Sequence, residues 1–370
     1  MRKPNVSENL AIELAFRIYG LKVITIKKMV SYDDQNFRIC VSKEHRNPYI
    51  ESIAEEGYTL KITNTTRSAE PDHFDIMHAT MNHLNLKGLR VPVPVKNLDG
   101  STWKMEVVPL LNEVESNFPD ERKCGIHLLT FISGVPISTV TYTSDLLFQW
   151  GALLARYHDA IQDFKCEALF KKKVFWNLEH VPEIENFMDG LEEQKKNLVL
   201  SVLKKYPEEI TENIANAPKC FIHGDFNENN ILVQMIKNES SDCTSYSVDG
   251  ILDFEDIHYS TYAWDIGVML AYAMLDCKIV DPLEGTGHAL AGYLSIRSLS
   301  GLELSLLRMC IACRLCQSLV LGAYSYKQDP GNSYIIISAR SGWNRLEQIC
   351  NISNEDLLNV WKKIQQQYNN

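Results

Sequence analysis

The chain has 370 residues, of which 45% are hydrophobic, 23% charged and 9% aromatic. This composition is that of a globular protein, and it excludes a disordered chain, a collagen-like repeat and a small disulfide-stapled scaffold. At about 150 residues per domain, the length favours two domains. The formal net charge is −10 and the basic residues form no long run, which argues against nucleic acid or an anionic membrane as a partner.

The ten cysteines are scattered from Cys40 to Cys350 without a paired framework, which is typical of reduced thiols. The N-terminus carries no apolar segment that would serve as a signal peptide, and no apolar run approaches the roughly 18 residues of a membrane-spanning helix. We therefore expect a cytoplasmic protein. Three cysteines recur at every third position of one expected helix, so they cannot close around a metal and are expected to be buried thiols: Cys310, Cys313 and Cys316.

The first third of the chain predicts a small, mostly antiparallel sheet with few helices. Ser7 can cap a helix whose apolar residues recur at helical spacing until Gly20. A second helix is expected from Pro71 to Gly88. Apolar stretches between turns predict strands over 21–26, 37–41, 58–62, 91–95, 104–110 and 126–132.

The character of the sequence changes after Gly134. Helical spacing recurs over 146–164 and 185–204, and nearly all of the chain from Tyr262 onward is expected to be helical. Three short strands are expected between these helices, over 220–222, 231–235 and 245–252. The pattern predicts an α+β protein of two lobes, a sheet-rich lobe over 1–133 and a mainly helical lobe over 134–370.

A polar loop between two apolar stretches carries the clearest chemical signal. In Ile222–Leu232, Asp225 is followed five positions later by Asn230, which is the spacing of a protein-kinase catalytic loop. In such a loop the aspartate accepts the proton of the attacking hydroxyl, and the asparagine oxygen binds Mg²⁺. A polar turn without chemistry is the alternative, and the spacing between two expected strands favours the catalytic interpretation.

A second carboxylate, Asp253, follows the next apolar stretch, where a kinase-like chain places the aspartate that bridges Mg²⁺ to the nucleotide phosphates. Such a chain also needs a lysine on the third strand and an acid on the following helix. Lys61 fits the first requirement, and Asp75 fits the second better than Asp72. A surface lysine and a solvated helix carboxylate stay open as alternatives at these positions.

The stretch 126–132 is expected to be the hinge strand whose backbone, at Thr130 and Phe131, hydrogen-bonds the nucleotide base. The turn before the second strand, Ser31–Asn36, contains no glycine, so a close backbone approach to phosphate is not expected there. Asn36 remains a candidate phosphate donor, although Asp33 and Asp34 place negative charge beside it.

The phrase His223-Gly224-Asp225, with Asn230 and Asp253, resembles the aminoglycoside phosphotransferase and choline kinase superfamily, which has the protein-kinase-like fold. Four further stretches are similar to the hydroxylysine kinases within that superfamily: Phe175–Leu178, Gly250–Phe254, Cys316–Val320 and Ser341–Trp343. The resemblance covers roughly residues 8 to 366. It implies GTP as phosphoryl donor, Mg²⁺ as cofactor and the side-chain hydroxyl of 5-hydroxy-L-lysine as acceptor.

The resemblance also implies roles for single residues. Asp225 would be the catalytic base, Asn230 and Asp253 would bind Mg²⁺, and Lys61, positioned by Asp75, would contact the α- and β-phosphates. Two residues would support the loop, with Asp265 bracing it from beneath and His223 ordering it through hydrogen bonds. Three acids near the loop would bind the ammonium groups of the substrate: Glu228, Glu255 and Asp256. The aromatic side chain of Trp176 would either shape the substrate pocket or only pack against the protein. Glu255 also replaces the glycine of a DFG-like loop.

Two other functions stay open from the sequence. The chain would have the same motifs if it phosphorylated another small alcohol such as choline, homoserine, a sugar or an aminoglycoside, because specificity resides in the helical lobe. A nucleotide-binding pseudokinase is the second alternative, favoured by the glycine-free turn and Glu255. Retention of Asp225, Asn230, Asp253 and Lys61 argues against it.

Overall fold

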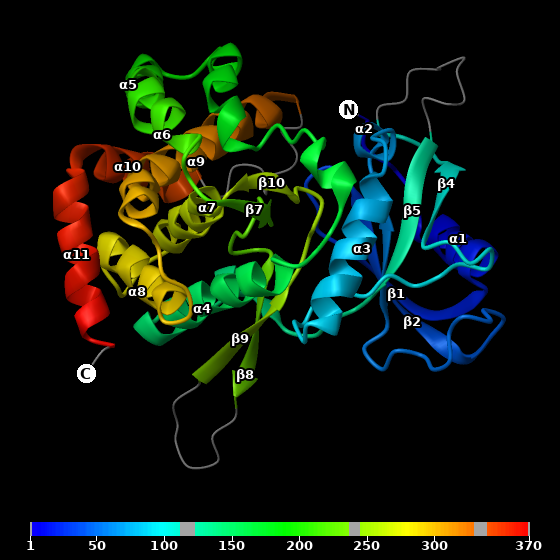
Figure 1. Ribbon diagram of the computed structural model, residues 1–370. Helices are drawn as coiled ribbons and strands as arrows, with labels where there is room; N and C mark the ends of the chain where they lie inside the picture. Colours follow the sequence, from blue (N-terminus) through cyan, green and yellow to red (C-terminus); the bar gives the residue numbers. More distant parts are fainter. Residues whose placement is uncertain (1, 112–122, 237–244, 329–338, 369–370) are drawn as a thin grey trace. The chain divides into compact units, whose positions relative to one another are not determined.

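The computed structural model describes residues 2–111, 123–236, 245–328 and 339–368, and the chain divides into two compact units, Met1–Ser133 and Gly134–Asn370 (Figure 1). The first unit contains an antiparallel sheet, and the second is mainly helical. The α+β class predicted from the sequence is confirmed.

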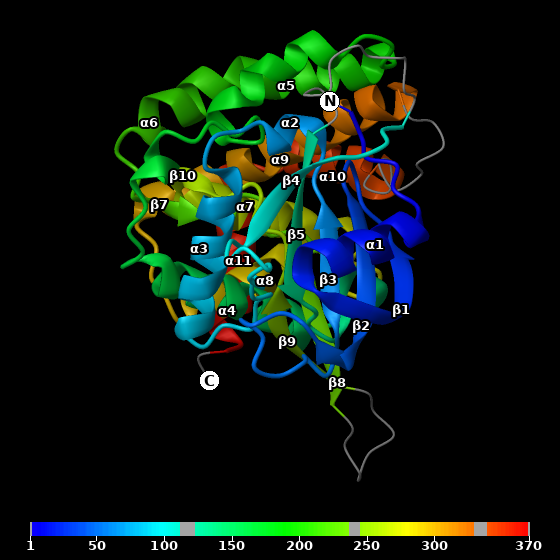
Figure 2. The same cartoon turned by 90° about the vertical axis from the view of Figure 1, so that its right-hand side faces the viewer.

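The sheet of the first unit has five strands in the order β1-β2-β3-β5-β4, with every neighbouring pair antiparallel. Helix α1 (Glu8–Tyr19) packs on one face of this sheet, and α3 (His73–Leu86) covers the other (Figures 1 and 2). A short helix, α2 (Thr65–Ser68), follows the third strand. The strands span Leu21–Met29 (β1), Gln35–His45 (β2), Tyr58–Ile62 (β3), Trp103–Val107 (β4) and Lys123–Thr130 (β5).

Along β5, successive side chains point alternately to the face of the sheet covered by α1 and to the face covered by α3. Ile126 and Leu128 belong to the apolar core that includes α1. His127, between them, faces α3, where its ring lies 5.3 Å from that of Phe74. Gly125 is on the same face as His127, and a Cβ there would lie 2.0 Å from the Phe74 ring, so only glycine lets α3 approach this closely.

Local signals placed the ends of α1 correctly, but one predicted strand is absent. The Ser7 hydroxyl accepts the Leu10 N–H at 3.2 Å, and Gly20 ends the helix with a left-handed φ of 67°.

The stretch 91–95 is not a strand and has only one bridge, between Pro94 and Leu129. Pro92 and Pro94 lack the N–H groups that a ladder requires.

A buried histidine on α3 gives the first prediction, a dependence of stability on pH. Burial lowers the pKa of His78 to about 3, whereas an unfolded histidine has a pKa of about 6.5. The unfolded state therefore takes up a proton below pH 6.5 that the folded state does not, and the unfolding free energy falls as pH falls. At pH 5.5 this residue should contribute a loss of about 1.4 kcal/mol. Denaturant titrations from pH 7.5 to 5.5 should show a shallower decline for His78→Gln, and parallel curves would contradict the prediction.

The second unit combines two small sheets with a large set of helices. Strands β7 (Lys219–Ile222) and β10 (His258–Thr261) form an antiparallel pair. Strands β6 (Val135–Pro136), β8 (Ile231–Ile236) and β9 (Ser245–Ile251) form the other sheet, in the order β6-β8-β9. The sequence did not predict β10, because its alternation of His, Tyr, Ser and Thr has no apolar run.

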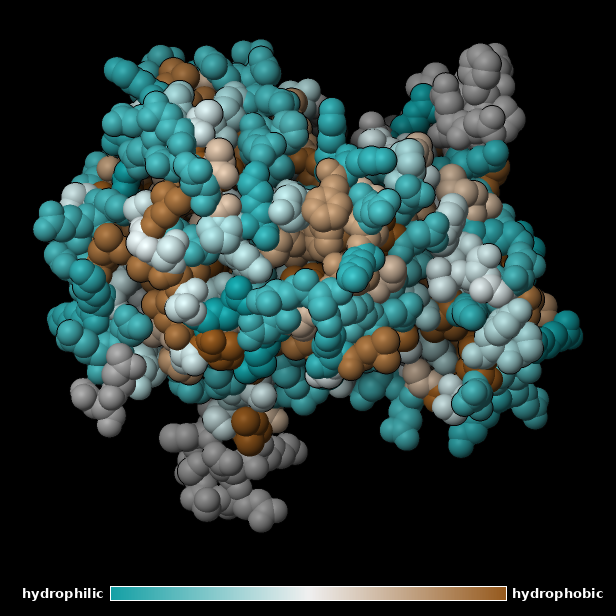
Figure 3. All heavy atoms as spheres, in the orientation of Figure 1, coloured by the Kyte–Doolittle hydropathy of each residue, from teal (hydrophilic) through white to brown (hydrophobic). Residues whose placement is uncertain are grey.

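The helices of the second unit follow the predicted order. They are α4 (Ser144–Ile161), α5 (Glu193–Tyr206), α6 (Glu212–Ile214), α7 (Tyr262–Leu275), α8 (Pro282–Leu294), α9 (Gly301–Gln328), α10 (Ala339–Asn351) and α11 (Asn354–Gln366). Between α4 and α5, the stretch 178–187 is a 3₁₀ helix with Pro182 inside it, so α5 starts later than expected. Figure 3 shows mostly hydrophilic residues on the outer side of α5 and α6. The buried residues of α5 are few: Val199, Val202 and Tyr206.

Helix α9 corrects the expectation that no segment is apolar enough to span a membrane. By length and composition alone, Gly301–Lys327 would be able to cross one, but 83% of its most apolar window is buried inside the fold. A core helix of a globular protein passes the same test. Its three cysteines, Cys310, Cys313 and Cys316, are fully buried free thiols whose pKa values are raised by burial, which confirms the interpretation as packing residues.

Candidate active site

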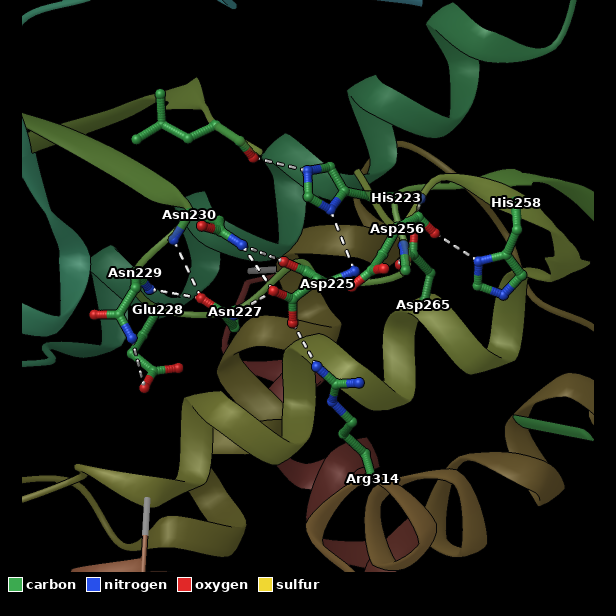
Figure 4. A network of polar contacts seen from close by, with 12 residues as sticks. His223, Asp225, Asn227, Glu228, Asn229, Asn230, Asp256, His258, Asp265 and Arg314 are labelled. Atoms are coloured by element: carbon green, nitrogen blue, oxygen red, sulfur yellow. Dashed lines mark hydrogen bonds and ion pairs between the residues drawn. The ribbon is translucent and has the colours of Figure 1, made fainter. Parts of the chain in front are cut away.

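The predicted catalytic loop connects β7 to β8 and turns sharply at its start. Gly224 has a φ of 80°, and a Cβ at this position would lie 2.5 Å from the carbonyl oxygen of Asp256. The N–H groups of His223 and Gly224 both donate to the carboxylate of Asp265, at 2.9 and 3.0 Å. Asp265 comes from α7, so one buried carboxylate ties the first turn of the loop to the helical core (Figure 4).

Asp265 is completely buried, yet its environment keeps it ionised. Burial acts to raise the pKa of this carboxyl, but the hydrogen bond from His158 and the contacts with His223 outweigh it and hold the pKa below its usual value. His158 Nε2 lies 3.1 Å from the carboxylate, and its Nδ1 lies 2.9 Å from the Tyr293 hydroxyl. Burial lowers the pKa of His158, so it is a neutral donor.

Replacing Asp265 by alanine should destabilise the protein more than a surface substitution. The change leaves two buried N–H groups and the His158 donor without their acceptor, at about 1–3 kcal/mol for each buried group. We expect a total loss of about 3–5 kcal/mol, measured by chemical denaturation. The matched control is Asp159→Ala on α4, whose side chain is half exposed and paired with Arg297. Its cost should stay within about 1 kcal/mol, and equal losses for both variants would contradict the assignment.

His223 makes the contacts expected of a residue that orders the loop. Its Nε2–H donates to the carbonyl oxygen of Leu252 at 3.0 Å, and its Nδ1 accepts the N–H of Asp225 at 3.3 Å. Burial lowers the pKa of His223, so the ring is neutral and uses one nitrogen as donor and the other as acceptor. The ring therefore links the catalytic loop to the end of β9.

Asp225 lies at the centre of a hydrogen-bond network (Figure 4). Its Oδ2 accepts the side-chain amides of Asn227 at 2.8 Å and Asn230 at 2.9 Å. Its Oδ1 forms an ion pair with Arg314 of α9. Burial raises the pKa of Asp225, and the charge of Arg314 opposes that shift. The sequence did not predict Arg314 in this site.

The two predicted metal ligands meet because of the register of the β8–β9 hairpin. Ile231 pairs with Ile251, and the N–H of Leu252 donates to the carbonyl oxygen of Asn230 at 2.8 Å. Asn230, before β8, and Asp253, after β9, therefore lie at the same end of the hairpin. Asn230 directs its amide nitrogen to Asp225, which leaves its oxygen for another partner. An amide oxygen and a carboxylate fit a hard cation such as Mg²⁺.

The loop that carries Asp253 has an unusual backbone at the aspartate itself. Asp253 has a φ of 59°, one of two positive values among the described residues other than glycine. The N–H of Glu255 donates to Asp253 Oδ1 at 3.4 Å. The left-handed residue of this loop is therefore Asp253, and Glu255 does not occupy a position that needs glycine.

The acids expected to bind substrate differ in how they are placed. Glu228 and Glu255 are more than nine-tenths buried, and burial raises the pKa of Glu228 to about 8. The Asp256 carbonyl accepts the Nδ1–H of His258 at 2.7 Å. Trp176 packs on the guanidinium of Arg314, 4.6 Å from its ring centroid, so its clearest contact is with a protein side chain.

In the first unit, the partner of Lys61 is Asp34, and the predicted pairing with Asp75 is wrong. Lys61 Nζ lies 3.3 Å from Asp34 Oδ2, and both residues are buried. Asp34 Oδ1 accepts the backbone N–H of Asn64 at 2.7 Å and its side-chain amide at 3.0 Å. Asp75 is exposed, and its carboxylate accepts the indole N–H of Trp103 at 2.9 Å. The turn before β2, and not α3, supplies the acid.

Asn36 is next to this pair, directly opposite Lys61 in the β2–β3 ladder. Its buried Oδ1 has no hydrogen bond within the described part of the chain. The predicted hinge donors are used inside the first unit: Thr130 N–H donates to Val93 at 2.9 Å and Phe131 N–H to Gly57 at 3.0 Å. These two N–H groups are engaged within the first unit, and base binding by the backbone at Thr130 and Phe131 stays a prediction.

The fold and this loop together define a kinase-like phosphotransferase. A model of a phosphotransferase enzyme family, APH, matches residues 44–298, which is more than half of the chain. The chain belongs to this family.

The curated relatives are similar over their whole length. The chain is 30% identical to hydroxylysine kinase of Bos taurus, over 100% of this chain and 96% of the relative. It is 30% identical to hydroxylysine kinase of Xenopus laevis, over 97% and 94%. The hydroxylysine kinase of Danio rerio is 26% identical, over 99% and 98%. The chain is therefore a small-molecule kinase that transfers a phosphoryl group to an alcohol.

Two solved structures show the same fold at low identity. An amicoumacin kinase in complex with AMP-PNP, Ca²⁺ and Ami has a TM-score of 0.65 at 15% identity, covering 95% of this chain and 97% of that one. A microcompartment-associated aminopropanol kinase also has a TM-score of 0.65 at 15% identity, covering 92% and 97%. At 15% identity, the similarity to these two structures shows a shared fold and nothing about the substrate.

Proposed function

We propose that the protein transfers the γ-phosphoryl group of GTP to the side-chain hydroxyl of 5-hydroxy-L-lysine. Full-length similarity to hydroxylysine kinases supports the acceptor, and GTP as donor is what the resemblance of the sequence motifs implies. The observation that carries the reaction type is the placement of Asp225 beside Asn230 and Asp253 at one end of the β8–β9 hairpin. We also infer a cytoplasmic protein, on the basis of its scattered thiols.

Asp225 acts as the base in this proposal. It orients the acceptor hydroxyl for in-line attack on the γ-phosphorus and accepts its proton. Lys61, held by Asp34, contacts the α- and β-phosphates. Asn230 and Asp253 would hold Mg²⁺, which would supply positive charge beside the phosphates. The described residues contain no group of three or more His, Cys, Asp or Glu that could bind a metal alone, so phosphate oxygens would complete its coordination.

The acids next to the loop are proposed to recognise the ammonium groups of the amino-acid substrate. Glu228 is the strongest of them, because its Oε2 is buried and makes no hydrogen bond within the described residues. A cationic substrate would supply that missing partner. Glu255 and Asp256, which follow Asp253 in the chain, are further candidates to bind the ammonium groups.

A nucleotide-release assay tests the proposal. GTP or ATP with Mg²⁺ is offered together with hydroxylysine, lysine, choline, homoserine or a sugar, and the release of GDP or ADP is measured. We expect release with GTP that requires hydroxylysine, fails with lysine and stops when EDTA removes the metal. Release with another acceptor would keep the mechanism and change the substrate. Intact nucleotide binding without turnover of any acceptor would favour a pseudokinase.

A further inference from the structure

Arg314 is a buried cation that contacts the predicted catalytic base from a distant part of the chain. It belongs to α9, its side chain is 3% exposed, and its Nη2 pairs with Asp225 Oδ1. The loop 223–230 contains no lysine or arginine of its own. The positive charge next to the base is thus supplied by a helix 89 residues further along the chain.

Two aromatic rings fix the orientation of this guanidinium. Its central carbon lies 4.6 Å from the ring centroid of Trp176 and 5.4 Å from that of Tyr272. Arginine stacks on aromatic faces through its planar charge, which leaves it little rotational freedom. Nε and Nη1 of Arg314 make no hydrogen bond within the described residues, so Asp225 is the anion that this guanidinium holds.

The hydrogen bonds of Asp225 distinguish its two oxygens. A carboxylate has about four acceptor sites, two on each oxygen. Oδ2 receives the amides of both Asn227 and Asn230, which uses its two sites. Oδ1 receives only Arg314, so one site remains on Oδ1 for a substrate hydroxyl. The direction of that site is set by where Arg314 holds Oδ1.

We propose that Arg314 is the positioning residue of the phosphoryl-transfer reaction, which aims Oδ1 of Asp225 at the acceptor hydroxyl. This inference rests on the proposed function as a kinase. In this proposal Oδ1 of Asp225 accepts the proton, and the stacking of Arg314 between Trp176 and Tyr272 fixes the orientation of the guanidinium that holds Oδ1. The guanidinium acts through Asp225, its ion-pair partner.

Kinetics of Arg314 variants test this role. Arg314→Gln should lower kcat about a hundredfold, the effect of a small misplacement of a reacting group, with the KM for nucleotide unchanged. Arg314→Lys, which keeps the charge without the fork, should recover about tenfold of that loss. The matched control is Arg308→Gln, which removes a buried arginine of the same helix that pairs with Glu209, and it should leave kcat within twofold.

A double-mutant cycle distinguishes positioning from general damage. In an Asp225→Asn background, Arg314→Gln should reduce kcat by less than twofold further, because position 225 no longer carries a base for Arg314 to orient. An equal hundredfold loss in both backgrounds, or unchanged kcat in Arg314→Gln alone, would overturn the proposal.

Thermal unfolding keeps this test separate from that of the proposed function, since it needs no substrate. Removing one partner of a buried pair leaves an uncompensated charge, whereas removing both does not. Asp225→Asn should therefore restore part of the fall in Tm that Arg314→Gln causes. Additive falls would overturn the pairing even in an active enzyme. If the wild-type protein turns over no acceptor, the proposed function fails, and coupled Tm values would then still support the pair.

Discussion

Asp225→Asn is expected to lower kcat by roughly 10³-fold, the middle of the range for loss of a general base. Asparagine has nearly the shape of aspartate and can still face Arg314 with its oxygen. It cannot accept a proton from the acceptor hydroxyl at neutral pH. Nucleotide affinity should stay within twofold, since the residues proposed to bind phosphate and metal, Lys61, Asn230 and Asp253, are unchanged.

Steady-state kinetics and isothermal titration of the nucleotide measure the two quantities separately. Asp145→Asn provides the control, because this carboxylate on α4 is exposed and accepts the side-chain amide of Gln149. We expect wild-type kcat from it. A variant Asp225→Asn that retains a tenth of wild-type turnover would show that Asp225 is not the base.

The residues of the catalytic loop were predictable because local sequence determines their positions. Asp225 and Asn230 follow a strand and precede another, and the loop between them is too short for alternative paths. Asp253 was predictable for a similar reason, since the β8–β9 hairpin returns the chain to Asn230. Asp265 begins a helix just after a short strand, and the resemblance to the kinase family supplied its role.

Arg314 and Asp34 could not be predicted, because their roles depend on packing between segments far apart in the sequence. Arg314 is one cation among apolar residues of α9, where a snorkelling surface arginine would look the same. Only the packing of α9 against the catalytic loop brings it to Asp225. The sequence gives one indication of its role, which is that Arg314 is a charged residue in the middle of an otherwise apolar stretch of helix.

The partners of the backbone N–H groups at Thr130 and Phe131 were also not predictable from the sequence. Thr130 and Phe131 end an apolar strand, as predicted, but the backbone partners of their N–H groups come from Val93 and Gly57. Val93 lies between two prolines in a segment expected to be a strand. This segment makes one bridge to β5, between Pro94 and Leu129, and its Val93 carbonyl accepts the hydrogen bond of Thr130, which no local pattern indicates.

Asp34→Asn is expected to disable the first unit, whereas Asp75→Asn is expected to be nearly silent. The first change removes the carboxylate that pairs with buried Lys61, and loss of one partner of such a pair costs about 3–5 kcal/mol. Turnover should fall about a hundredfold, because Lys61 is no longer held for phosphate contact. Asparagine at position 75 keeps an oxygen for the Trp103 indole, so its cost should stay within about 0.5 kcal/mol.

The two variants compare Asp34 and Asp75, two acids between which the sequence pattern does not distinguish as partners of Lys61. In a protein kinase the acid that holds the strand lysine comes from the helix after it, and movement of that helix controls activity. Here an acid that pairs with the lysine comes from the turn before β2, in the same sheet as the lysine. Urea denaturation and kcat/KM for the nucleotide measure both consequences. A larger effect of Asp75→Asn on either quantity would return the role to α3.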